Sequence, residues 1–427
     1  MQDQGSISSR LSQRALDSLA APVPLRAKLI RALPELYHPT LNPTGAINMG
    51  LAHNDLMQKD IMEKLSTCLE FQTSDLEYGD PHGSRVLRGL VADLMNRHFN
   101  PVIPLHFRNI TVVPGAGAAV WQLVQSLADP GDSVMVLAPY YGNFDLDVCV
   151  STGVKLIPIY PHHSMDGGID MDLLNSTKII GTKCKVLLIT NPRNPHGCCY
   201  SVKDMKHLLT FASKHSLHVI FDEVYGLSTF NPIPGTESSL FEPFTSVLSI
   251  ANIEQWIAPQ LVHVVYGMSK DFCLNGLRLG FIVDQYNADL RSAVTLSSMF
   301  GYMSTLNDRL VCNLLKDTTW IDWFVNTNRQ RLYKAYELTT KYLEQLGIEY
   351  IPSGVGPFIV VKIDRLFKNH GQEISFEIEE AIWETALLNG VYIAQGYVFH
   401  CLEPGYFRLT YSLEWDHNNL HMLWGTS

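Results

Sequence analysis

Short apolar runs alternate with segments of helical periodicity over the first three hundred residues. Five of these runs are rich in β-branched residues and end in polar residues, Gly or Pro: NITVVP, DSVMVLAPYY, KVLLITNP, LHVIFDEVY and VHVVYGMSK. Short apolar runs bounded by such residues are typical of buried strands. The sequence therefore predicts strands covered on both faces, as in a mostly parallel sheet.

Segments between these runs have the apolar spacing of helices. SRVLRGLVADLMNRHF (84–99) is one example, and AVWQLVQSLA (119–128) follows the small-residue turn that begins at Pro114. Another helix is predicted to begin after Ser201, as its N-cap, with Asp204 at the third helical position. Strands that alternate with helices predict an α/β fold with helices on both sheet faces.

The pattern changes after about residue 305. A long helical segment, TWIDWFVNTNRQRLYKAYELTTKYLEQLG, is followed by the strand-like runs IEYIPSGVGPFIVVKID and YFRLTYSLE. We therefore expect a second, smaller α+β domain at the C-terminus. The predicted parts are an N-terminal arm over residues 1–47 that packs with the small domain, a large domain over 48–305 and a small domain over 306–427.

Polar residues and glycines collect where the predicted strands end. Ligands bind at the carboxyl ends of the strands in open parallel sheets, so these residues are expected to line one edge. Taken singly, each has an ordinary structural explanation, because Gly-rich turns, Asn-Pro pairs and solvated lysines are common. Together they form one candidate site: Gly117, Ala118, Tyr141, Asn194, Asp222, Tyr225, Ser269, Lys270 and Arg278.

One end of this set suits an anionic, planar group. Backbone N–H groups of Gly117 and Ala118 at a helix N-terminus, together with the fixed cation of Arg278, suit a phosphate. The same glycine-rich segment is also compatible with a simple tight turn, since it lacks the GxGxxG spacing. Tyr141 is the candidate aromatic platform for a ring.

The other end of the set suits an aldehyde-bearing pyridine ring. A buried carboxylate such as Asp222 keeps a pyridine nitrogen protonated. Asn194 and Tyr225 suit a phenolic oxygen. Lys270, with a pKa lowered by burial and by a neighbouring cation, suits the aldehyde as nucleophile and later as proton carrier.

The composition and net charge of the chain limit the classes of partner that it is expected to bind. The chain has 427 residues and a formal charge of -10, and its basic residues are scattered, which argues against nucleic acid and anionic membranes as partners. Its eight cysteines show no CxxC or other metal-like spacing, so we expect reduced thiols and no metal. No signal peptide or transmembrane segment is predicted, and we expect a cytoplasmic protein.

The order of the motifs carries a resemblance. GAGAA, PYYGNFD, TNPRNPHG, FDEVY, YGMSKDFCLNGLRLGF and FRLTYS resemble the fold-type I pyridoxal phosphate enzymes of the class I and II aminotransferase superfamily. The most similar branch is that of the 1-aminocyclopropane-1-carboxylate (ACC) synthase-like proteins. The resemblance implies the fold-type I transferase fold, with a mostly parallel seven-stranded sheet in the large domain. It also implies pyridoxal 5′-phosphate as cofactor and a homodimer with shared sites.

The resemblance also implies roles for individual residues. Lys270 is the implied Schiff-base lysine, with Asp222 on the ring nitrogen and Tyr225 on the phenolic oxygen, and these three are the expected catalytic residues. Arg408 is the implied clamp for the α-carboxylate of an amino-acid substrate, with Ala52 and His53 on the substrate side.

Three positions depart from the pattern of the family. His53 stands where ACC synthases carry a glutamate that helps to recognise a sulfonium substrate. Pro81 stands where the family donates a tyrosine across the dimer, and Gly267 replaces a phosphate-binding serine. We expect the cofactor to bind through the remaining contacts and the substrate to differ.

The expected function is that of a pyridoxal-phosphate-dependent enzyme acting at the α-amino group or Cα of an amino acid. Transamination and carbon–sulfur elimination both remain open, and a role in secondary metabolism is implied by analogy only. True ACC synthesis, a γ-elimination of S-adenosylmethionine, is the alternative. A non-catalytic binding module is the alternative of another class, and the presence of Lys270, Asp222, Arg278 and Arg408 argues against it.

Overall fold

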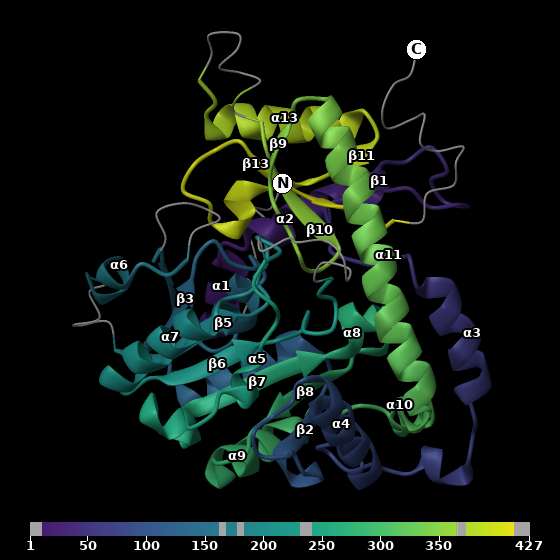
Figure 1. Ribbon diagram of the computed structural model, residues 1–427, viewed down its shortest axis with the longest axis vertical. Coiled ribbons are helices and arrows are strands. Elements are labelled where there is room, and N and C mark those ends of the chain that lie inside the picture. Colours follow the sequence, from purple (N-terminus) through teal and green to yellow (C-terminus); the bar gives the residue numbers. More distant parts are fainter. Residues whose placement is uncertain are drawn as a thin grey trace, which may run out of the picture.

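A seven-stranded sheet forms the larger part of the computed structural model, which describes residues 11–161, 168–176, 183–230, 241–363, 365 and 373–413 (Figure 1). Its strand order is β2-β8-β7-β6-β5-β3-β4. Strand β8 is antiparallel to both neighbours, and all other pairs are parallel. The strands are β2 (Ile110–Val113), β3 (Ser133–Leu137), β4 (Lys155–Ile159), β5 (Cys184–Thr190), β6 (His218–Asp222), β7 (Val262–Gly267) and β8 (Gly280–Val283). The predicted fold class is confirmed.

Helices cover both faces of this sheet. Leu187 and Ile189 of β5 belong to one apolar core, whereas Val186 and Leu188 belong to the other, as the alternation of side chains along a strand requires. The first core is closed by α4 (Arg85–His98), α7 (Val202–Lys214) and α10 (Thr305–Lys316), and the second by α5 (Ala116–Leu127) and α9 (Ala288–Ser298). This double cover explains why β2 and β3 are apolar along most of their length.

Two helix starts follow the sequence prediction. The Ser84 hydroxyl caps α4 by accepting a hydrogen bond from Leu87 N at 3.0 Å. At the start of α7, Ser201 Oγ accepts from Asp204 N at 3.0 Å and donates to the Asp204 carboxylate at 2.7 Å. The predicted N-cap Ser201 is therefore confirmed, and Ser84 caps its helix in the same way, because each hydroxyl satisfies a backbone donor that the helix leaves open.

A smaller antiparallel sheet lies above the large one in the view of Figure 1. Its order is β12-β13-β10-β9, with β9 (Glu349–Ile351), β10 (Phe358–Lys362), β12 (Ala394–Gln395) and β13 (Tyr406–Thr410). The long helix α11 (Thr318–Gln345) runs from the large sheet to the small one, which also packs with α13 (Phe376–Leu388). The other α-helices in the described part of the chain are α1 (Gln13–Ala20), α2 (Pro24–Ala32), α3 (Gln58–Cys68), α6 (Met171–Ser176) and α8 (Met268–Asp271).

The N-terminal segment is tied to the C-terminal part of the chain. Strand β1 (Ile47–Asn48) pairs in parallel with β11 (Val391–Tyr392). Helix α10, by contrast, packs against α4 and α3 on the core of the large sheet. The division at residues 47 and 305 stays a prediction, and α11 is the element that connects the two sheets.

Several features of the described residues bear on the expected partners. All eight cysteines are free. In the same described ranges, no helix has the length and apolar content needed to cross a bilayer, and no cluster of three or more His, Cys, Asp or Glu side chains is arranged to hold a metal.

Candidate active site

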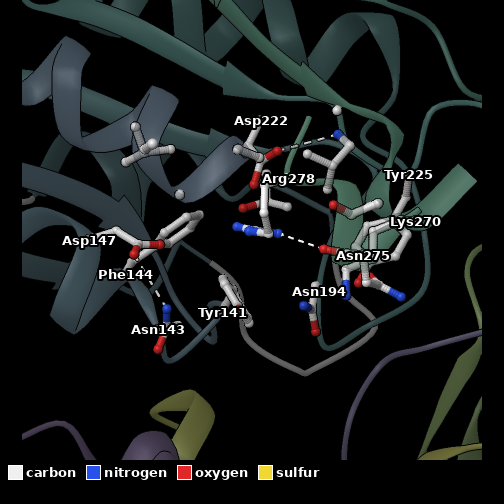
Figure 2. Close-up of a pocket in the computed structure, with 18 residues that line it drawn as sticks. Tyr141, Asn143, Phe144, Asp147, Asn194, Asp222, Tyr225, Lys270, Asn275 and Arg278 are labelled. Carbon is white, nitrogen blue, oxygen red and sulfur yellow. Dashed lines mark hydrogen bonds between the residues drawn. The ribbon is translucent and has the colours of Figure 1, made fainter. Parts of the chain in front are cut away.

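A pocket of about 270 Å³ opens at the carboxyl ends of β5, β6 and β7 (Figure 2). Nine of the residues predicted from strand ends line it together: Gly117, Ala118, Tyr141, Asn194, Asp222, Tyr225, Ser269, Lys270 and Arg278. They come from five separate segments of the chain. The structure thus brings this part of the predicted site together.

The glycine turn before α5 packs directly on Arg278. Gly115 has φ +103°, and a Cβ at this position would collide with the Arg278 guanidinium. Arg278 itself has φ +56°, and its Nη1 donates to the Asn275 carbonyl at 3.0 Å (Figure 2). The first N–H groups of a helix have no partner within it, so α5 presents donors beside a fixed cation. This end of the pocket suits an anion.

Lys270 lies in the short helix α8, directly after β7. Its Nζ donates to the Ala52 carbonyl at 2.6 Å. Burial, with Arg408 and Arg278 nearby, lowers the pKa of the Lys270 amine to about 8, against the opposing effect of Asp222. The lowered pKa increases the neutral fraction of this amine, and the neutral form can act as a nucleophile and a base.

Asp222 is the last residue of β6, and its side chain points into the pocket (Figure 2). Its carboxylate accepts a hydrogen bond from Val224 N at 3.3 Å. Burial raises the pKa of Asp222 to about 7; Asp147 raises it further and Lys270 opposes the rise. A cation placed beside this carboxylate would be strongly favoured, because it would remove the cost of a buried charge.

The ring-binding side chains are held by packing. Tyr225 meets Phe358 edge to face, with ring centroids 5.4 Å apart, and burial raises the pKa of its hydroxyl. Tyr141 contacts Phe144 in the same manner at 5.5 Å. Such contacts fix the planes of the aromatic rings that border the pocket.

Arg408, on β13, is not among the described residues that line the pocket, but it contacts the lining residue Asn194. Its side chain donates to the Asn194 side-chain oxygen at 2.9 Å and to the Gly50 carbonyl at 2.6 Å, and it lies between the rings of Phe358 and Phe399. The residue is 3% exposed. Among the described residues, nothing accepts a hydrogen bond from its buried Nε. A buried guanidinium that meets only neutral acceptors suits a carboxylate ligand.

The two remaining predicted residues are placed differently. Ala52 contributes its backbone carbonyl to Lys270. The His53 side chain lies outside the set of described residues that line the pocket, with Nδ1 3.0 Å from the Leu51 carbonyl and Nε2 3.5 Å from the Asp55 carboxylate. The imidazole therefore belongs to the 51–55 segment rather than to the pocket wall.

Gly267 has a packing explanation in this chain. A Cβ there would lie 2.9 Å from the Leu279 carbonyl oxygen on the neighbouring segment. The close approach of β7 to β8 therefore favours glycine at this position. Pro81, the other departure, lies away from the pocket of this single chain.

The sequence analysis missed several polar residues that line the pocket, among them Asp147 and Thr190. Asp147 lies on a π-helical turn (Asp145–Val150), where Asn143 Nδ2 donates to its carboxylate at 3.3 Å. Burial raises the pKa of Asp147 to about 7. Thr190 is the last residue of β5, and its position before Asn191-Pro192 is the one signal that could have identified it.

Comparisons with known proteins fit this geometry. The family described as aminotransferase class I and II matches residues 46–423. The chain belongs to the class I and II aminotransferase family. It is 31% identical to 1-aminocyclopropane-1-carboxylate synthase 2 of Cucurbita pepo, over 88% of this chain and 76% of that protein. It is 30% identical to a mouse protein named probable inactive 1-aminocyclopropane-1-carboxylate synthase-like protein 2, over 88% of this chain and 64% of the mouse protein.

The comparison with solved structures also places the fold among those of aminotransferases. A double mutant of Thermus thermophilus aspartate aminotransferase superposes with a TM-score of 0.72 at 20% identity, covering 96% of this chain and 97% of that one. The resemblance to fold-type I enzymes predicted from the sequence is therefore confirmed, and the cofactor of the family is pyridoxal 5′-phosphate.

The residues present fit this cofactor. The cradle between Gly115 and Arg278 offers the cation and helix N-terminus that a phosphate needs. Asp222 offers a buried carboxylate for a protonated ring nitrogen, and Lys270 offers a buried amine for an aldehyde. As a family member, the chain is thus equipped for the chemistry of class I and II aminotransferases.

Proposed function

We propose that this protein is a pyridoxal-phosphate-dependent enzyme that removes the α-proton of an amino acid, with Lys270 as cofactor attachment and proton carrier. The observation that carries the proposal is the position of the Lys270 amine. It is held by Ala52 O in a pocket that also contains Asp222 and Arg278, and its pKa is lowered to about 8. Such an amine can both bind an aldehyde and accept a proton.

The chain supplies binding and orientation for this chemistry. When bound, the pyridoxal ring draws electrons from the substrate Cα, which makes the α-proton acidic. Asp222 holds the ring nitrogen in its protonated form, and the Asn194 amide and Tyr225 hydroxyl hold the phenolic oxygen. Tyr141 covers the face of the ring.

The phosphate is assigned to the opposite end of the pocket. Gly117 and Ala118 present backbone N–H groups, Ser269 a hydroxyl and Arg278 a guanidinium. A fixed phosphate also fixes the distance from the ring to Lys270, and such positioning is worth several kcal/mol to a reaction.

The substrate is an α-amino acid in this proposal, because Arg408 suits an α-carboxylate. Its buried guanidinium keeps Nε without a partner among the described residues, and Asn194 and the Gly50 carbonyl hold the rest of the group in place. A carboxylate bound here would lie beside Asn194, which lines the same pocket as Lys270.

Two fates of the substrate are consistent with this site: transamination, and elimination with carbon–sulfur cleavage. ACC synthesis is a further candidate because of the identity to the Cucurbita pepo enzyme. His53 weighs against it, since an imidazole outside the pocket wall does not replace a sulfonium-binding carboxylate. The name of the mouse relative suggests a non-catalytic protein as an alternative. The argument against this alternative is that the chain retains Lys270, Asp222, Arg278 and Arg408.

A homodimer is part of the proposal. Tyr78 and Phe300 are 97% and 95% exposed in the single chain, and Leu76 is also largely exposed. Thr305 Oγ1 donates to the Asp75 carbonyl at 2.6 Å and so joins the segments that carry these side chains. Large apolar residues exposed together mark an interface. Sedimentation equilibrium should give twice the chain mass, and a monomer at micromolar concentration would contradict this part.

The function is tested by mixing the purified holoprotein with a panel of amino acids and cysteine thioethers. Transamination should give the α-keto acid and the amine form of the cofactor, and a second keto acid should restore the original spectrum. Elimination should instead release ammonia, a keto acid and a thiol with the cofactor spectrum regained. No spectral change with any amino acid would favour the non-catalytic alternative.

A further inference from the structure

The hydroxyl of Thr190 is a buried polar group of the pocket to which the proposed function gives no role. Its oxygen is buried, Thr190 lines the pocket, and among the residues that the structure describes nothing forms a hydrogen bond with it. A buried hydroxyl without a partner carries a free-energy cost. We therefore expect the Thr190 hydroxyl to form a hydrogen bond with another group when the site is occupied.

Thr190 lies beside Asp222 in the sheet. The two residues are direct partners of the parallel strands β5 and β6, and the Asn191 N–H donates to the Asp222 carbonyl at 2.9 Å. Neighbouring strands lie about 4.8 Å apart, and residues paired in register present side chains to the same face. Both side chains line the same pocket. The Thr190 hydroxyl and the Asp222 carboxylate therefore lie next to each other at the carboxyl edge of the sheet.

Asp222 is short of donors for a buried carboxylate. Within the described part of the chain, its side chain accepts one hydrogen bond, from Val224 N at 3.3 Å, which is long for an N–H···O bond. Burial raises the pKa of this carboxyl group to about 7. A protonated carboxyl group cannot balance a protonated ring nitrogen, and a further donor beside Asp222 would favour the charged form.

We propose that Thr190 is a positioning residue for Asp222: its hydroxyl donates a hydrogen bond to the Asp222 carboxylate and keeps it charged and directed into the pocket. This inference rests on the proposed function, because it assumes that Asp222 holds the ring nitrogen of pyridoxal phosphate. The titratable groups that act on Asp222 or respond to it are Asp147, Lys270, Glu223, Tyr141 and Tyr225. None of them donates to the carboxylate among the described hydrogen bonds.

The test compares Thr190→Val, which keeps the shape and removes the hydroxyl, with Thr190→Ser, which keeps the hydroxyl. The readout is the dissociation constant of pyridoxal phosphate from the apoprotein, measured by fluorescence titration between pH 6.5 and 8.5. We expect the valine variant to bind about 10-fold more weakly at pH 6.5, and the serine variant to stay within about 3-fold of the unmodified protein.

The pH dependence separates this role from simple packing. Loss of a donor raises the pKa of Asp222, so the carboxyl group stays protonated to higher pH and the defect should shrink toward pH 8.5. A packing defect would be equal at all pH values. Thr111→Val, at a buried threonine on β2 outside the pocket, controls for the general effect of this substitution in the sheet.

Each outcome decides the inference. Equal cofactor affinity of the valine variant overturns it, as does a serine variant that binds as weakly as the valine variant or a defect independent of pH. Should Thr190→Val fail to fold, Thr190→Ala carries the same expectation. Failure of the unmodified apoprotein to bind the cofactor would instead overturn the proposed function, and the inference with it.

Discussion

The two sides of the pocket are built in different ways. The cofactor side is formed by the ends of β5, β6 and β7, whose main chains are hydrogen-bonded in register, as in the bond from Asn191 N to the Asp222 carbonyl. The substrate side joins Arg408 on β13 to the segment before α3. There, Thr410 Oγ1 donates to the Leu51 carbonyl at 2.7 Å and Ser412 Oγ to the His53 carbonyl at 2.6 Å.

Because the two sides are built differently, substitutions can change cofactor binding and substrate use independently. The cofactor side is fixed by one sheet, whereas the substrate side exists only where residues 49–53 and the C-terminal strand are packed together. Within the described residues, the sides are connected by hydrogen bonds from Lys270 Nζ to Ala52 O and from Arg408 Nη1 to Asn194 Oδ1. We therefore expect most substitutions to affect either cofactor binding or substrate use, and loss of the Lys270 amine to affect both.

Lys270→Ala should have the largest effect. Removal of the amine takes away both the cofactor attachment and the proton carrier, so the rate of α-proton exchange, followed by NMR in D₂O, should fall about 1000-fold or more. The visible absorption of the lysine-bound cofactor should also disappear. Lys155→Ala, at an exposed residue of β4, is the control and should retain both signals.

Arg408→Gln should have the second largest effect, and this effect should be on the substrate side of the pocket. Loss of the buried guanidinium should lower kcat/KM for an amino acid by about 100-fold, whereas the affinity for pyridoxal phosphate should change by less than about 3-fold. Steady-state kinetics and cofactor titration measure the two effects. Arg365→Gln, at an exposed residue, serves as control. Equal losses on both measurements would show that the sides are not separable.

The same contrast explains what the sequence could reveal. Lys270, Asp222 and Asn194 were predictable because apolar runs mark where strands end, and parallel strand ends share an edge. Thr190 was missed because a threonine at the end of a β-branched run has the composition of an ordinary strand residue. The Ala52 carbonyl has no side chain to recognise, and its contact with Lys270 depends on residues 218 positions apart.

Asp222→Asn should have a moderate effect on the stability of the apoprotein. In the folded chain the pKa of Asp222 is raised to about 7 from a usual value of 3.8, so the folded state binds a proton in this interval that the unfolded chain has released. The contribution of Asp222 to stability is thus present below about pH 4 and is lost as the pH rises through 7.

The neutral amide of the Asp222→Asn variant cannot follow this titration. The difference in free energy of unfolding, variant minus unmodified protein, should therefore grow by at least about 1 kcal/mol between pH 4.5 and 7.5. Urea denaturation at both pH values measures it. Asp289→Asn, at an exposed residue of α9, should give the same difference at both pH values. A constant difference for Asp222→Asn would mean that the carboxylate is already charged in the apoprotein.

His53→Glu should have the smallest effect. It is the most stringent test of whether the cofactor side and the substrate side are independent. The imidazole is half-buried and contacts its own segment rather than the pocket wall, so cofactor affinity should stay within about 2-fold. A partly exposed carboxylate is worth up to about 1 kcal/mol to a cation, so kcat/KM for S-adenosylmethionine relative to a neutral amino acid should rise by about 5-fold at most. His38→Glu, at an exposed histidine, should leave this ratio unchanged. A large loss of cofactor affinity in His53→Glu would mean that the 51–55 segment also shapes the cofactor side through Ala52 and Lys270, and the two sides would then have to be treated as one unit.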